Sequence, residues 1–343
     1  MTEGTLFENG SDNGNGNGAG AEAARNRVLR ELGDGEQFTT ALVVRERQLR
    51  QKKNGEDFIK LQLGDRTGAV AAIAWDRVAE IFEACSPGAI VMVTGKFSVH
   101  PQFGRQIKLV SVRAAESHEY EQEQLTEGPA KSIDLLEGEL RELLATIQNP
   151  SLRALLDRFF GPGTPAWERF RQAPAAKHYH EAYAGGLLEH TLSVAQAVSA
   201  AANFFPGINR EIAVTGALLH DIGKTEAYND EPLAIDMTDA GRLQAEIPLG
   251  YYRVRREIEE IEGFNPDLAQ AVLHIILSHH GQLEHGSPVV PCTREATLVH
   301  AMDNLGGKLG SFDRLEKDLA DGESWSRFDR GIESAAFFGD RAA

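Results

Sequence analysis

The 343-residue sequence has only two cysteines, no long apolar run and no excess of basic side chains. Cys85 and Cys292 lie far apart and form no CxxC pair, which argues against a disulfide framework or a cysteine zinc cluster. No stretch approaches the roughly 20 apolar residues of a membrane-spanning helix, and the N-terminus lacks the basic and apolar segments of a signal peptide. We therefore expect a cytoplasmic protein that has no membrane partner.

The acidic balance of the chain would ordinarily argue against nucleic acid as a partner. The net charge is −16, whereas phosphate backbones attract basic surfaces. The charge is uneven, however, because residues 38–113 carry 12 Lys and Arg against 7 Asp and Glu. This basic segment within an acidic chain keeps nucleic acid open as a ligand.

The composition of the first third of the chain changes near residue 35. Residues 1–35 are rich in Gly, Asn and acidic side chains, which predicts a disordered tail. Five short β-rich runs follow within residues 36–115, separated by Gly, Asn, Asp and Pro. A helical stretch at 76–85 lies between the third and fourth runs, where an OB-fold places its helix. We therefore predict an OB-fold nucleic-acid-binding barrel over residues 36–115.

The rest of the chain has a helical pattern. Residues 116–135 are charged and contain Gly and Pro, as expected of a linker. From 136 to 325 apolar residues recur at helical spacing, and we expect residues 326–343 to be a C-terminal tail. The predicted fold class is multidomain, with an N-terminal all-β barrel followed by an all-α domain.

Histidines are concentrated in the helical part, which holds nine of the 11. One apolar helix there ends in His220, Asp221 and Lys224. Burying an unpaired carboxylate is costly, so Asp221 should have a cationic partner. The simplest alternative is an ion pair between Asp221 and Lys224 on the helix surface, which this segment alone leaves about as probable as a functional site.

Two further residues favour a site. His190 lies 30 residues before His220, and Asp303 lies 82 residues after Asp221, each on the apolar side of a predicted helix. Two imidazoles and two carboxylates form a mixed nitrogen and oxygen set suited to Mn, Fe, Co, Ni or Zn. The conjunction predicts one divalent-metal site.

These residues resemble the signature of the HD-domain metal-dependent phosphohydrolases, a pattern H…HD…D in which HD often continues as HDxGK. In this sequence the pattern reads His190, His220-Asp221-Ile222-Gly223-Lys224 and Asp303. The resemblance covers most of residues 170–310. It implies an all-α HD domain with these His and Asp residues as metal ligands and with Lys224 as a phosphate-contacting cation. It also implies catalytic roles for Asp221 and His180, while the general acid stays open among His180, His274 and His279.

The segments 180–191 and 276–281, together with the OB-like module, make the chain similar to the YhaM-type 3′→5′ exoribonucleases. In two-metal members of the HD group, further histidines bind a second ion, and one pair resembles His279-His280. Tyr251 or Tyr252 stands where another of those histidines is expected. The resemblance therefore leaves three roles open for His279 and His280, namely a second metal site, a phosphate site, or neither.

OB-like barrels bind single strands through a basic groove and through aromatic faces on which bases stack. For a single aromatic residue, a place in the barrel core is the better prediction. The stronger indication is the clustering of cations in two predicted loops. The predicted nucleic-acid contacts are Arg50, Lys52, Lys53, Phe58, Trp75, Phe103, Arg105 and Lys108.

The leading hypothesis is a metal-dependent 3′→5′ exoribonuclease in which the barrel holds single-stranded RNA and the HD site releases nucleoside monophosphates. We expect Mn2+ as the cofactor, with Mg2+, Co2+, Fe2+, Ni2+ and Zn2+ left open. Two alternatives remain, namely a nucleotide or cyclic-nucleotide phosphohydrolase with a regulatory barrel, and a non-catalytic single-strand-binding protein. A DNA substrate and a homo-oligomer also stay open.

Overall fold

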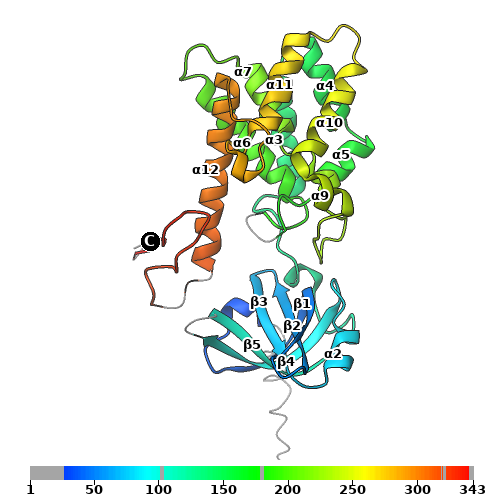
Figure 1. Cartoon of the computed structure of the whole chain (residues 1–343), viewed down its shortest axis with the longest axis vertical. Coiled ribbons are helices and arrows are strands. Elements are labelled where there is room, and N and C mark those ends of the chain that lie inside the picture. The colour runs from blue at the N-terminus through cyan, green and yellow to red at the C-terminus, as the bar shows by residue number, and fades with distance from the viewer. Residues whose placement is uncertain (1–26, 101–103, 178–180, 318, 320–321, 340–343) are drawn as a thin grey trace, which may run out of the picture.

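The structure is a computed structural model that describes residues 27–100, 104–177, 181–317, 319 and 322–339. Within these residues a closed β-barrel comes first and a helical domain follows, which confirms the predicted multidomain fold. The two domains stack along the long axis of the molecule (Figure 1). In this described part of the chain, no helix is both long enough and apolar enough to cross a membrane.

Five strands close the barrel in the order β1-β2-β3-β5-β4. Strands β3 and β5 pair in parallel, and the other neighbours are antiparallel. The helix between β3 and β4 lies where the sequence predicts it, and this order is that of an OB-fold. The elements are η1 (Leu29–Glu31), β1 (Gln37–Gln51), β2 (Asp57–Asp65), β3 (Gly68–Ala74), α2 (Val78–Ala84), β4 (Ile90–His100), β5 (Gly104–Ala114) and η2 (Gln122–Gln124).

Alternating side chains fill the barrel. On β2, Ile59, Leu61 and Leu63 are buried, whereas Lys60 between them is exposed. Successive side chains of a strand point to opposite faces, so one face of β2 forms the interior. Phe97 on β4 is buried in the same cluster and is therefore a core residue.

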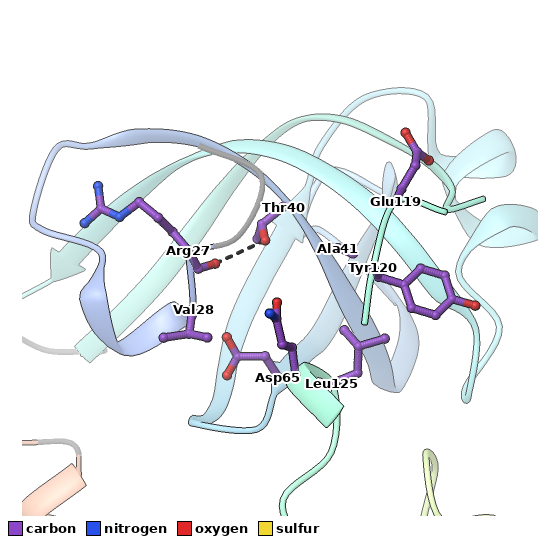
Figure 2. Close-up of a pocket in the computed structure, with 9 residues that line it drawn as sticks. Arg27, Val28, Thr40, Ala41, Asp65, Glu119, Tyr120 and Leu125 are labelled. Carbon is purple, nitrogen blue, oxygen red and sulfur yellow. Dashed lines mark hydrogen bonds between the residues drawn. The ribbon is translucent and has the colours of Figure 1, made fainter. Parts of the chain in front are cut away.

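The segment before β1 belongs to the barrel. Leu29 is buried, and its backbone N–H donates to Asp65 Oδ2 at 2.5 Å. The Thr40 hydroxyl donates to the Arg27 carbonyl at 3.1 Å, so the segment is held along its length (Figure 2). The predicted tail over residues 1–35 therefore ends too late, because its last part buries apolar side chains against the barrel.

The predicted linker over residues 116–135 is also packed rather than free. Leu125 is buried in a small cluster with Ala41 and Met92 of the barrel. Helical structure then starts at Ile133, slightly before the predicted boundary. The linker thus forms part of the junction between the two domains.

The helical domain has one apolar core that draws on nearly all of its longer helices. Helices α6, α7, α11 and α12 pack against one another in that core. The helices are α3 (Ile133–Ala145), α4 (Pro150–Phe160), α5 (Pro165–Phe170), α6 (Gly186–Ala202), α7 (Arg210–Leu219), α8 (Lys224–Ala227), α9 (Asp239–Gln244), α10 (Glu246–Glu259), α11 (Pro266–Ser278), η3 (Leu283–His285) and α12 (Arg294–Lys317).

Asparagine caps fix where three of these helices begin. The side chains of Asn149, Asn209 and Asn265 accept backbone N–H groups in the first turns of α4, α7 and α11. Such a cap satisfies donors that the helix leaves free, and proline follows it in α4 and α11. Helices α7 and α11 therefore have defined lengths, and site residues follow directly at their other ends.

The predicted C-terminal tail over residues 326–343 is folded where it is described. The Arg314 guanidinium on α12 lies 2.6 Å from Asp329 Oδ2. The rings of Trp325 and Phe337 lie 4.8 Å apart across a β-bridge. This segment therefore continues the fold along α12 (Figure 1).

Candidate metal centre

Side chains from four helical elements meet in the helical domain. His190 lies on α6, Asp221 lies just after α7, His279 follows α11, and Asp303 lies on α12. The first three are nearly inaccessible to solvent, and Asp303 is mostly buried. These polar groups are thus inside an apolar core, where each needs a partner.

Asp221 is the centre of this cluster. Its Oδ2 atom lies 3.4 Å from His190 Nε2 and 3.3 Å from His220 Nε2, and its Oδ1 atom lies 3.5 Å from His279 Nε2. Asp303 Oδ1 lies 3.2 Å from His190 Nε2. The four residues predicted as metal ligands are therefore brought together, and His279 joins them.

Backbone carbonyls orient the imidazoles. The Nδ1 atom of His220 lies 2.6 Å from the Ala217 carbonyl, and that of His279 lies 2.8 Å from the Ile276 carbonyl. These contacts place the proton on Nδ1, so Nε2 faces the cluster as an acceptor. Both rings are thereby oriented as metal ligands usually are.

His190 has a carboxylate behind it instead. Its Nδ1 atom lies 3.2 Å from Glu181 Oε2, an arrangement that orients ligating histidines in many metal sites. Glu181 has a left-handed backbone with φ 53°, which is uncommon for a residue other than glycine. Glu181 was not among the predicted site residues, although it lies in the segment 180–191 that carries the family resemblance.

Several buried atoms of the cluster lack a partner that a bound cation would supply. Within the described residues, the Nε2 atoms of His220 and His279 and the Oδ1 atom of Asp221 are buried without a hydrogen-bond partner. Such groups are rare in folded proteins because they lose hydration without compensation. Imidazole nitrogens and carboxylate oxygens suit a divalent transition metal, so the residues present fit such an ion.

The pKa shifts of His190 and Asp303 show that the cluster attracts positive charge. Burial opposes charge on His190, but Asp303, Glu181 and Asp221 outweigh it and raise the pKa of this imidazole to about 10. Burial likewise opposes ionisation of Asp303, yet a hydrogen bond from His190 and the other histidines lower the pKa of this carboxyl. The carboxylates thus stay charged and attract a proton or a metal.

Lys224 forms the ion pair with Asp221 that the sequence left open, but this pair is not on the surface. Its Nζ atom lies 2.7 Å from Asp221 Oδ2, and its side chain is only 14% exposed. Burial lowers the pKa of Lys224, and the attraction of Asp221 overcomes this effect and raises it. Lys224 therefore stays charged at the edge of the cluster.

The predicted helix through the HD motif is interrupted. Helix α7 ends at Leu219 and α8 starts at Lys224, with a turn between them. A side chain at Gly223 would collide with the Glu246 carbonyl of α10. Glycine therefore lets α10 pack directly on the turn that carries His220 and Asp221.

A second set of possible ligands shares Asp221. One ligand atom each from Asp221, His279 and His280 lie within 4.8 Å of one another. Tyr252 is 61% exposed, and the Tyr251 hydroxyl lies 3.0 Å from Arg255 Nη1 on its own helix. Neither observation places Tyr251 or Tyr252 in the second set of ligands.

The carboxylate that approaches the second set is Glu246, whose Oε1 atom lies 3.9 Å from His280 Nε2. It starts α10 directly after Ala245, a residue with φ 60°. A strained backbone held next to a site is often part of the site. No motif marked Glu246, so only the packing of α10 on the turn brings it into view.

Two further histidines, His180 and His274, were candidates for the general acid. His180 falls outside the described residues. His274 Nε2 accepts the backbone N–H of Cys292 at 2.9 Å, and burial lowers the pKa of His274. The geometry therefore favours His279 over His274 as a site residue.

Comparisons with known proteins agree with this geometry. The HD domain family model matches residues 187–307, the segment that holds the His and Asp cluster. A 3′-5′ exoribonuclease YhaM from Geobacillus sp. (strain WCH70) is 30% identical and covers 89% of this chain and 92% of its own. The chain belongs to the YhaM family. Its relative from Bacillus subtilis (strain 168), also named 3′-5′ exoribonuclease YhaM, is 28% identical over 92% of this chain and 98% of its own.

The family assignment confirms the resemblance found in the sequence. An HD domain implies a divalent metal, and the buried His and Asp residues lie within the matched segment. Among solved structures, the second OB-fold domain of replication protein A from Methanococcus maripaludis covers 26% of this chain and 95% of its own, at 21% identity and a TM-score of 0.22. The strand order β1-β2-β3-β5-β4 of the closed barrel carries the OB-fold assignment.

The barrel of this YhaM-family chain presents an aromatic pair to solvent. The rings of Phe58 and Trp75 stack with their centroids 4.9 Å apart. Lys52 Nζ lies 5.1 Å from the centre of the Trp75 ring, and Trp75 is 47% exposed. Three of the predicted nucleic-acid contacts thus form one surface, in contrast to the buried Phe97.

The remaining predicted contacts that the structure describes have different environments. Arg105 donates to the Leu29 carbonyl at 2.7 Å and so holds the segment before β1. Arg50 bonds to Gln48 on its own strand, whereas Lys53 and Lys108 are exposed. Phe103 lies outside the described residues.

Proposed function

We propose that this protein is a metal-dependent 3′→5′ exoribonuclease that hydrolyses single-stranded RNA to nucleoside monophosphates. One observation carries the proposal, namely that a buried His and Asp cluster with unpaired ligand atoms shares its chain with a barrel bearing an exposed aromatic stack. The relatives named 3′-5′ exoribonuclease match this chain across both domains. A cytoplasmic location, where RNA is made and degraded in bacteria, is part of the proposal.

The proposed first metal ligands are His190, His220, Asp221 and Asp303. A divalent ion held there would activate water for attack and polarise a phosphoryl oxygen. Lys224 would place its fixed charge against the phosphoryl oxygens, where negative charge grows during the reaction. We propose Mn2+ as the ion, since it accepts nitrogen and oxygen donors together.

We further propose that Asp221, His279, His280 and Glu246 hold a second ion. Asp221 offers one oxygen to each set, and Glu246 would supply a carboxylate where the sequence comparison leads one to expect a histidine. Burial and the nearby His279 lower the pKa of His280, which keeps this imidazole neutral and able to ligate.

Replacing Glu246 with glutamine should remove the second ion and leave the first in place. The substitution keeps the shape of the side chain but removes the charge that would attract the ion. Metal content per chain, measured by elemental analysis after equilibration with Mn2+, checks this. Glu259→Gln on the same helix is the control, because its exposed carboxylate pairs with Arg255. Unchanged metal content in Glu246→Gln would remove this residue from the ligand set.

Replacing Trp75 with alanine should weaken single-stranded RNA binding by about 5- to 150-fold, the range expected when one base loses an aromatic platform. Phe58 would lose its stacking partner in the same change. Fluorescence anisotropy of a labelled oligoribonucleotide on metal-free protein measures the affinity without cleavage. Tyr252→Ala is the control, because this aromatic ring is exposed on the helical domain. Equal losses of RNA affinity in Trp75→Ala and Tyr252→Ala would contradict a role for Trp75 in RNA binding.

A substrate panel tests the proposal against its alternatives. Release of nucleoside monophosphates from oligoribonucleotides at higher kcat/KM than hydrolysis of cyclic nucleotides is expected. Preference for a cyclic nucleotide or a free nucleotide would favour a small-molecule phosphohydrolase. RNA binding without any hydrolysis would favour a single-strand-binding protein; the proximity of the four proposed first-set ligands and Lys224 to one another supports the enzyme instead.

A further inference from the structure

Strand β1 has an irregularity at Arg45. Val44 pairs with Leu63 and Glu46 pairs with Gln62, so Arg45 has no partner in the ladder between them. A β-bulge of this kind bends the strand and changes the direction of a side chain, and bulges are frequent beside functional sites.

The Arg45 side chain leaves the barrel and joins three segments. Its Nη1 atom donates to the carbonyls of Pro232 at 3.4 Å and Leu233 at 3.1 Å, and its Nη2 atom donates to the Leu125 carbonyl at 3.0 Å. The planar guanidinium offers several donors in fixed directions, which a lysine cannot reproduce. One barrel residue thus holds both the interdomain segment and a loop of the helical domain.

Neighbouring contacts reinforce this junction. Lys177 Nζ lies 3.0 Å from Glu46 Oε1 and 3.1 Å from Asp236 Oδ1, so it joins the other side of the bulge to the same loop. The Leu233 side chain packs against the barrel cluster that contains Val43. Polar and apolar contacts therefore converge on residues 229–237.

Those residues directly follow the HD motif and are fixed to it. The backbone N–H of Tyr228 donates to the Lys224 carbonyl at 3.1 Å, and the Thr238 hydroxyl donates to the Glu226 carbonyl at 2.7 Å. Tyr228 and Met237 close the loop as an antiparallel β-bridge. The barrel is consequently docked on the same piece of chain that carries Lys224 at the metal centre.

We propose that the Arg45 bulge positions the barrel against the metal centre, so that a strand bound on the barrel reaches the HD site with its end aligned for cleavage. This rests on the proposed exoribonuclease function. A polymer must engage both domains at once, and the geometry between them sets the effective concentration of its end at the site. A small phosphodiester needs only the metal centre. Arg45 is therefore a positioning residue for polymeric substrates.

The test compares two substrates in the full-length, Mn2+-loaded protein. One is a single-stranded oligo(A) long enough to span both domains, and the other is bis(p-nitrophenyl) phosphate. Arg45→Ala should lower kcat/KM for the oligomer by ~10- to 100-fold, the scale of a misplaced substrate, and leave hydrolysis of the small ester unchanged. Arg45→Lys, which can reach fewer of the carbonyls, should recover part of the loss.

Two further variants keep the test decisive. Arg47→Ala removes the same charge from the same strand, but Arg47 contacts Phe82 within the barrel, so the substrate ratio should stay as in wild type. Lys177→Gln removes the ion bridge to Glu46 and Asp236 without altering the barrel. It should show the same selective loss on the oligomer as Arg45→Ala, and it therefore replaces Arg45→Ala as the test if Arg45→Ala folds poorly.

Equal losses on both substrates in Arg45→Ala and Lys177→Gln would overturn the proposal, because the contacts would then only support the fold. Undiminished oligomer cleavage in both variants would also overturn it. If the wild-type protein hydrolyses the small ester but not the oligomer, the exoribonuclease function itself fails, which is a different result from either of these.

Discussion

Asp221→Asn should lower hydrolysis of single-stranded RNA by roughly 10,000-fold or more, the scale of loss when one member of a catalytic unit is removed. Asp221 contacts His190, His220, His279 and Lys224 at once. Asparagine keeps its shape but removes the charge that would bind the ion. It also brings an amide N–H2 donor toward the Lys224 ammonium, which needs an acceptor.

Strand binding provides the internal check on this variant. Because the aromatic stack on the barrel is remote in sequence and lies in the other domain, RNA affinity should stay near the wild-type value. Asp313→Asn is the matched control, since Asp313 is an exposed carboxylate on α12. Initial rates of monophosphate release measure the effect, and wild-type rates in Asp221→Asn would refute the assignment of the centre.

Chelation by EDTA should abolish RNA hydrolysis, and added Mn2+ should restore it. An ion that binds only the folded chain stabilises it by about 4 kcal/mol at 1,000 times its Kd. Such an ion would supply the partner that the buried atoms of His220, His279 and Asp221 lack. Thermal unfolding with and without Mn2+ therefore reports binding independently of activity.

The same experiment has a defined pH dependence. In the metal-free protein the pKa of His190 is raised to about 10, so its stabilising ion pair is complete below the ordinary value of 6.5 and is lost as pH rises through 10. A metal ligand must instead be unprotonated, so the stabilisation by Mn2+ should grow as the pH rises toward about 10. Identical pH profiles with and without Mn2+ would show that His190 does not bind the ion.

The fold could be predicted to the extent that each segment carries its own periodicity. Alternation on β2 and the helical spacing of α7 gave the two domain types correctly. The ends of the barrel could not be predicted, because Leu29 and Leu125 belong to short polar segments and are buried only by contact with distant strands. Local pattern does not contain that information.

The site divides in the same way. His190, His220, Asp221 and Asp303 were predicted because they form a spaced motif, and the structure brings them together. Glu246 was missed because only the close packing of α10 at Gly223 brings it near His280. Motifs identify residues that share a segment or a pattern, whereas residues gathered by helix packing need the three-dimensional structure.

The role of Arg45 could not be predicted from the sequence either. In the sequence Arg45 is one of several cations on a predicted strand, with nothing to distinguish it from Arg47. Its different role arises from the register shift between Val44 and Glu46, which depends on how β1 and β2 pair. Pairing register is a tertiary property, so the interdomain contact could not be anticipated.

The most direct test of the central claim is a time course with 5′-labelled single-stranded RNA and the Mn2+-loaded protein, resolved by length, with Asp221→Asn as the inactive reference. We predict a ladder of labelled products that shorten progressively from the 3′ end, together with released nucleoside monophosphates. Immediate appearance of the label as a mononucleotide, or the same ladder from Asp221→Asn, would contradict a 3′→5′ exoribonuclease acting at this metal centre.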